Sequence, residues 1–251
     1  MTSEQAPRGS GDAWTEPKPT ALLVLADGTV LEGMGLGAEG QATGEVCFNT
    51  AMTGYQEILT DPSYAAQIVA FTFPHIGNVG ANSEDMEGSS PAANAAARGA
   101  IFRAVPTPPS NWRADDTLDV WLKKRNVIAL AGIDTRALTK RIRERGMPNG
   151  VIAHAPAGKF DFAKLAKKAA AWSGLEGLDL AKQVTTAQSY TSEEGRWRWP
   201  AGVAQITKPR FDVVVFDYGV KKNILRSLGD VGARAHVLPA NATAQDALAR
   251  K

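Results

Sequence analysis

The spacing of apolar and polar residues predicts an α/β chain that begins with a β-hairpin. Two apolar runs in residues 21–33 flank Asp27-Gly28, a pair typical of two-residue hairpin turns because it accepts positive φ. Short apolar runs predict further strands at 45–49, 67–73, 98–105, 126–132 and 150–155. Segments with helical composition and end signals predict helices at 115–126, 134–146 and 161–172.

A second pattern occupies residues 211–251, where a continuous apolar run opens an order of strand, helix, strand and helix. Such an order is typical of a doubly wound parallel sheet. Two strands and two helices are too few to cover both faces of that sheet, so we expect this second domain to be incomplete. Polar and aromatic residues at 183–210 predict a linker between it and a first domain at 20–182. Residues 1–19, rich in Pro, Gly and Ser, predict a disordered tail.

Composition excludes several classes of protein. The chain has 251 residues, 44% of them hydrophobic, and a net charge of +2, as in an ordinary globular protein. Its basic residues are not clustered with aromatic ones, so we expect no nucleic-acid partner. No apolar run approaches the roughly 18 residues needed to cross a bilayer, so we expect no membrane span. A single cysteine excludes an intrachain disulfide and favours a reducing, cytoplasmic location.

Three sequence features invite a chemical role that their context argues against. Residues 35–40 match the G-x-G-x-x-G dinucleotide pattern, but a strand-like run follows in place of a helix, so we interpret the glycines as turn and bulge positions. Cys47 lies within a short apolar strand, which favours a core residue over a nucleophile. His75, His154 and His236 are far apart and share no helical spacing, so we expect no metal site.

Residues 49–82 carry only two formally charged side chains, Glu57 and Asp61, among many Thr, Gly and Asn residues. Uncharged polar groups suit a surface buried against another protein surface, because pairing them costs less desolvation than pairing ions. The segment is therefore predicted to form a junction. His75 follows Pro74 at a strand end and is a candidate for that junction, the alternative being a hydrogen bond to the loop backbone.

Residues 44–82 closely resemble the signature of the small, glutamine-hydrolysing chain of carbamoyl-phosphate synthetase. The likeness continues in order through residues 21–29, 132–146, 177–186 and 213–228, and covers about residues 20–251. The resemblance implies an N-terminal swivelling β/β/α domain, followed by the first part of a class I glutamine amidotransferase domain with a flavodoxin-like parallel sheet.

The resemblance also implies a function and a partner. In that family a Cys-His-Glu triad hydrolyses L-glutamine, and the ammonia travels through a tunnel to a large subunit that uses ATP and Mg to make carbamoyl phosphate for arginine and pyrimidine synthesis. The triad belongs beyond the last motif matched here and Cys47 does not align with its nucleophile. We therefore expect no catalytic residue and no cofactor in this chain, and no glutamine hydrolysis by it alone. The alternative is a non-catalytic docking module that binds the large subunit.

Two candidate site residues remain. Ser63 lies in the sequence Asp-Pro-Ser-Tyr, where its own chemistry suggests a local turn cap. The resemblance implies instead that Ser63 reaches across a domain junction to bind glutamine. Lys221, which follows the first strand of the second domain, is a candidate for the same junction, and the alternative is a solvated lysine in the first turn of a helix.

Overall fold

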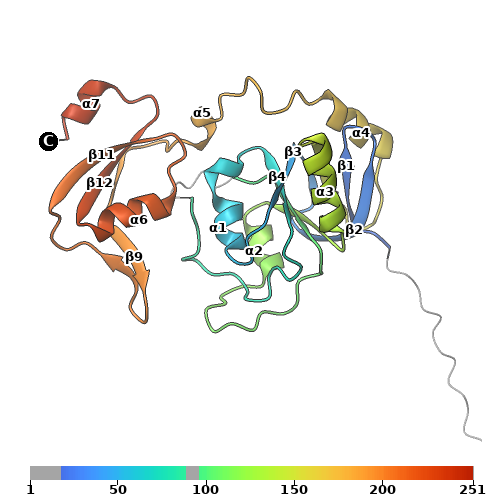
Figure 1. Cartoon of the computed structure of the whole chain (residues 1–251), viewed down its shortest axis with the longest axis horizontal. Helices are drawn as coiled ribbons and strands as arrows, with labels where there is room; N and C mark the ends of the chain where they lie inside the picture. The colour runs from blue at the N-terminus through green and yellow to red at the C-terminus, as the bar shows by residue number, and fades with distance from the viewer. Residues whose placement is uncertain (1–17, 89–95, 251) are drawn as a thin grey trace, which may run out of the picture.

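The structure, a computed structural model, describes residues 18–88 and 96–250 of the chain (Figure 1). Helices and mixed sheets alternate through these residues, so the α/β class is confirmed. The tail predicted at 1–19 lies outside the described residues except for Lys18 and Pro19.

A closed β-barrel forms the earlier part of the chain. Its strands are β1 Ala21–Leu25, β2 Val30–Gly37, β3 Gly40–Asn49, β4 Gln67–Phe71, β5 Gly99–Phe102, β6 Ile128–Ala131 and β7 Asn149–His154. Their order around the barrel is β1-β2-β6-β5-β4-β3-β7. The neighbours from β3 through β4 and β5 to β6 are parallel, and the remaining pairs are antiparallel. The predicted hairpin is confirmed, with Ala21 opposite Gly33 and Gly28 at φ +84° in its turn.

Helices pack against the strands of this barrel. They are α1 Tyr55–Thr60, the short 3-10 helix η1 Pro62–Tyr64, α2 Leu118–Lys124, α3 Thr135–Arg145 and α4 Phe162–Ala171. Leu138 and Ile142 of α3 pack with Ile68 and the other inward residues of the strands, while α1 and α2 cover the opposite face of β4, β5 and β6. Because side chains alternate along a strand, β4 is buried on both faces, which explains its unbroken apolar sequence.

The low charge of residues 49–82 follows largely from this packing. The segment contains β4, between β3 and β5, and α1, which the sequence analysis did not predict. Most of its apolar residues belong to the barrel's own core. It meets the later part of the chain at Asp61 and Pro62. The segment is therefore part of the barrel core, with a contact to the later part of the chain at its Asp61–Pro62 turn.

The glycines of residues 35–40 lie in β2 and at the start of β3. A Cβ on Gly35 would clash with the imidazole of His154, whose Nδ1 lies 3.0 Å from the carbonyl oxygen of Ala38. Gly37 and Gly40 have φ of +71° and +121°, a region that L side chains rarely adopt. Strand packing and turn geometry thus require these glycines.

The later part of the chain forms a smaller α/β unit. Its elements are α5 Ala181–Val184, β8 Tyr190–Ser192, β9 Glu194–Arg198, β10 Gly202–Gln205, β11 Phe211–Asp217, α6 Lys222–Asp230, β12 Ala233–Pro239 and α7 Ala244–Leu248. The sheet has the order β11-β12-β8, with β11 and β12 parallel as the sequence predicted and β8 antiparallel to β12. α6 packs on it through Leu225 and Leu228.

The interval 183–210 corrects one expectation. Predicted as a linker, it contains the end of α5, strand β8 and the β9–β10 hairpin. These strands are short and polar, and β8 becomes a strand by pairing with β12, more than 40 residues later. The limits predicted for the two domains, at 182 and 211, stay a prediction. Figure 1 shows α6 on the side of this unit that faces α1 and the barrel.

Candidate functional site

The junction between barrel and α6 is closed by an ion pair. Asp61, which follows α1, is 6% exposed, and its Oδ2 lies 2.7 Å from Nζ of Lys221. The hydrogen bond to Asp61 is the largest cause that raises the pKa of the Lys221 ammonium above its ordinary value. Lys221 is the residue directly before α6, so the pair joins residues 160 positions apart in the sequence.

Ser63 lies on the same turn as Asp61. The other carboxylate oxygen, Oδ1, accepts a hydrogen bond of 2.8 Å from the Ser63 backbone N–H, which caps the turn Pro62–Tyr64. Tyr64 accepts a hydrogen bond of 2.9 Å at its hydroxyl from the Asn49 side chain. Ser63 itself is exposed. The turn therefore holds the backbone of Ser63 and leaves its side chain accessible.

Asp217, the last residue of β11, organises the loop that leads to Lys221. Its side chain is buried, with 1% exposure. Oδ1 accepts hydrogen bonds from the backbone N–H groups of Gly219 at 2.9 Å and Val220 at 2.8 Å, and Oδ2 accepts one from Thr186 at 2.7 Å. Carboxylates that accept several backbone N–H bonds fix local backbone geometry strongly. Asp217 thus fixes the backbone position of the loop that directly precedes Lys221.

Glu87 supplies a second link across the junction. Its carbonyl oxygen accepts from the N–H of Lys222 at 2.8 Å, and its Oε2 accepts from the N–H of Asn223 at 2.9 Å. These are first-turn N–H groups of α6, which the N-cap residue Lys221 does not satisfy with its own side chain. The Glu87 N–H in turn donates to Oγ1 of Thr60 at 2.9 Å. The end of α1 and the start of α6 are therefore joined through residue 87 as well as through Asp61.

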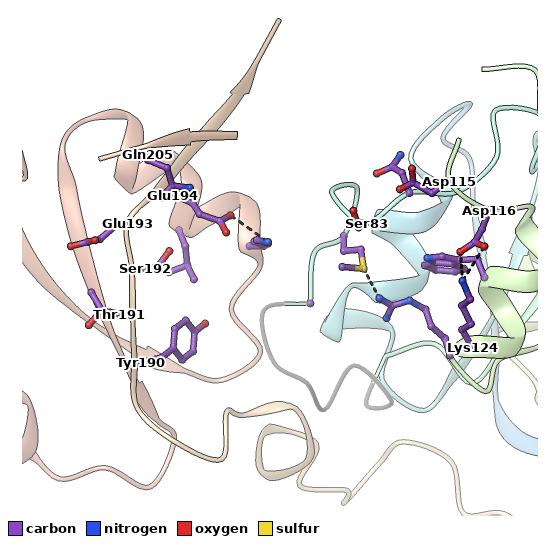
Figure 2. Close-up of a pocket in the computed structure, with 17 residues that line it drawn as sticks. Ser83, Asp115, Asp116, Lys124, Tyr190, Thr191, Ser192, Glu193, Glu194 and Gln205 are labelled. Atoms are coloured by element: carbon purple, nitrogen blue, oxygen red, sulfur yellow. Dashed lines mark hydrogen bonds and ion pairs between the residues drawn. The ribbon is translucent and has the colours of Figure 1, made fainter. Parts of the chain in front are cut away.

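A cleft of about 940 Å³ opens beside this junction (Figure 2). One wall comes from the barrel side, including Ser83, Asp116 and Lys124, and the other from β8, β9, β10 and α6, including Glu194 and Lys222. Ion pairs within the walls join Lys124 to Asp116 at 2.7 Å and Lys222 to Glu194 at 3.3 Å.

The cleft and the candidate residues adjoin without coinciding. Lys222, which lines the cleft, is the chain neighbour of Lys221, and Gly88, also in the lining, forms a β-bridge with Lys221. Ser63 and Lys221 are not among the lining residues. The structure thus brings Ser63 and Lys221 to the same carboxylate, at one edge of the cleft.

His75, the third candidate, takes a different position. It is exposed, and its ring lies edge-on to Phe73 of the same segment, with 6.5 Å between the ring centroids. Its place at the junction stays a prediction. Among the described residues, no group of three or more His, Cys, Asp and Glu side chains is arranged to hold a metal ion. No helix in residues 18–88 and 96–250 is long and apolar enough to cross a membrane.

Cys47 is buried in the barrel core, with 5% exposure. Burial, with a contribution from the nearby Glu45 charge, raises the pKa of its thiol from 9.0 to about 12. The thiolate is the reactive form, so we expect the folded chain to resist a thiol reagent at pH 8 and to react once unfolded in guanidinium. The disulfide reagent DTNB, followed by its absorbance, measures both rates. Equal reaction rates with and without guanidinium would contradict the assignment of Cys47 as a buried core residue.

Three residues of the junction were not predicted as site residues. From the sequence alone, Asp61 is named only as one of the two charged residues of 49–82, and Asp217 falls within the apolar run that opens residues 211–251. Asp61 directly follows α1 and Asp217 ends β11, and each precedes a Pro or a Gly within two positions, which is a signal for side-chain capping of a turn. Glu87 lies in a polar loop, and no sequence pattern marks its contact with α6.

A closed barrel joined through the Lys221–Asp61 ion pair to a partly parallel α/β unit defines a two-part α/β protein. The model of the carbamoyl-phosphate synthase small chain, CPSase domain, matches residues 23–152, and the chain belongs to this family.

Similar proteins cover nearly the whole chain. It is 64% identical over 234 residues to the carbamoyl phosphate synthase small chain of Caulobacter vibrioides, covering 93% of this chain and 60% of that one. The carbamoyl phosphate synthase small chain of Brucella anthropi is 62% identical over 248 residues, and the match covers 99% of this chain and 60% of the Brucella protein. This chain therefore spans about 60% of the length of these relatives. Among solved structures, a peptidase M28 precursor from Shewanella amazonensis is similar to this chain with a TM-score of only 0.32 and 8% identity, covering 54% of this chain and 34% of that one.

Proposed function

We propose that this chain acts as the small subunit of a glutamine-dependent carbamoyl-phosphate synthetase and contributes Ser63 to the binding of L-glutamine. The observation that carries the proposal is the turn at Asp61, which presents an exposed Ser63 beside the junction in a chain of this family. A serine hydroxyl can donate a hydrogen bond to a carboxylate and accept one from an ammonium group, the two charged ends of a free amino acid.

In this proposal, residues other than these 251 carry out glutamine hydrolysis and carbamoyl phosphate synthesis. The barrel corresponds to the swivelling β/β/α domain, and the β11–α6–β12 unit to the start of a class I glutamine amidotransferase domain. The residues that hydrolyse glutamine belong to the part of the relatives that this chain does not span. The large subunit uses ATP and Mg²⁺ with the released ammonia, and the complex works in the cytoplasm.

A second candidate function is docking without catalysis. The observation that favours it is that Cys47, the single cysteine of these 251 residues, is buried in the barrel core, where a thiol is a poor nucleophile. In that case the chain binds the large subunit and leaves its use of glutamine unchanged.

The test replaces Ser63 by alanine in a chain of the relatives' full length, assembled with its large subunit. We expect the KM for glutamine to rise about ten- to hundredfold, because one hydrogen bond to a charged group contributes about 1.5–3 kcal/mol. Carbamoyl phosphate synthesis from added ammonium salt should keep its rate, since that route does not require glutamine. Both are measured as steady-state product formation.

Ser110 offers a matched control. It is also exposed and on a loop, with its hydroxyl bonded to the carbonyl oxygen of Asn78 at 3.3 Å. Ser110→Ala should leave the KM for glutamine unchanged. An unaltered KM in Ser63→Ala would remove the assignment of Ser63, and a parent complex that uses ammonia and ignores glutamine would favour docking without catalysis.

A further inference from the structure

Asp61 binds both candidate residues with one carboxylate. Oδ1 accepts the Ser63 N–H at 2.8 Å and Oδ2 accepts a proton of the Lys221 ammonium at 2.7 Å. The Asp61 side chain is 9% exposed. Burying a carboxylate costs several kcal/mol unless its oxygens are paired, so losing either partner is costly here.

The ion pair Asp179–Lys182 is more exposed to solvent than the Asp61–Lys221 pair. Its N–O distance is also 2.7 Å, but its side chains are 52% and 82% exposed. Exposed pairs are screened by water and contribute little to stability. The two ion pairs have the same N–O distance, but breaking the Asp61 pair is expected to cost more free energy because its carboxylate is buried. Of the two, the Asp61 pair is the one that joins the barrel to the later part of the chain.

The backbone around Lys221 is held independently of Asp61. Asp217 fixes the loop before it, and Glu87 fixes the first turn of α6 after it. The Lys221 side chain is 42% exposed, and its ammonium group carries three donors, more than the single contact with Asp61 Oδ2 uses. What Asp61 adds is the direction of that side chain relative to Ser63.

We propose that Asp61 is a positioning residue of the glutamine site, which holds Lys221 against the Ser63 turn so that both meet the same amino acid. The inference rests on the proposed function, because it takes Ser63 to be a glutamine contact. Asp61 does not touch glutamine. It acts through Ser63 and Lys221, and its loss weakens capture of glutamine while leaving the use of ammonia intact.

Two substitutions separate the roles of the two oxygens. Asp61→Asn keeps an oxygen for the Ser63 N–H and removes the charge that holds Lys221, whereas Asp61→Ala removes both. In the assembled complex we expect Asp61→Asn to raise the KM for glutamine about tenfold with less than a twofold change in kcat, and Asp61→Ala to raise it further. Lys221→Met should resemble Asp61→Asn, and the double variant should be no worse than the poorer single one, because both remove the same contact.

The control is Asp179→Asn, which breaks an ion pair of equal length away from the junction and should match the parent. Melting curves and co-elution with the large subunit establish that each variant folds and assembles. An unchanged KM in a folded Asp61→Asn variant, or additive effects in the double variant, overturns the inference. If Ser63→Ala is impaired and Asp61→Asn is normal, the inference alone fails, and if the parent does not use glutamine, the proposed function fails with it.

Discussion

Asp217→Ala is expected to lower the free energy of unfolding of the later part of the chain by about 3–5 kcal/mol. The substitution leaves the buried N–H group of Thr186 and the partly buried N–H groups of Gly219 and Val220 without their acceptor. Each buried donor without a partner costs about 1–3 kcal/mol, and water that enters the space recovers part of that sum. Urea denaturation followed by tryptophan fluorescence measures the loss.

Asp212 provides the comparison on the same strand. It pairs with Arg234 at 2.7 Å, but it is exposed, so Asp212→Ala should remain close to the parent. Hydrogen exchange adds a local readout: the amides of residues 219–223 should lose protection in Asp217→Ala before the barrel strands do. Stability equal to that of Asp212→Ala would show that Asp217 does not organise the loop.

Phe102→Ala is expected to destabilise the barrel by about 3–5 kcal/mol. Phe102 lies on β5 with no exposure, and its ring centroid is 5.6 Å from that of Phe71 on β4. The truncation removes apolar area and opens a cavity that the surrounding parallel strands cannot close, because each is paired on both edges. Guanidinium denaturation with the m-value checked for constancy measures the change.

Val105→Ala is the control for Phe102→Ala. Val105 lies three residues further along the chain and is 52% exposed, so its truncation should cost less than about 0.5 kcal/mol. A loss below about 1.5 kcal/mol in Phe102→Ala would mean that the core around β4 and β5 closes over the missing ring.

Local signals were sufficient for most helices and strands. The Asp27-Gly28 turn and the Asp134 cap depend on residues at most a few positions apart, and the structure has both. Helix α1 was missed because it is six residues long, starts at a glycine without a side-chain cap and lies between segments of similar composition. Strand β8 was missed because a polar triplet carries no periodicity of its own.

The sequence by itself determined the family, the order of most elements and the hairpin and helix ends, because these depend on neighbouring residues or on motifs in fixed order. The tertiary structure alone decided that the strands close into a barrel, that residues 190–205 contain three strands, and that Asp61 holds both Ser63 and Lys221. The physical reason is distance along the chain. Contacts such as those of Asp61 with Lys221 and Glu87 with Asn223 join residues more than 130 positions apart, and no local propensity encodes which distant partner a buried charge will find.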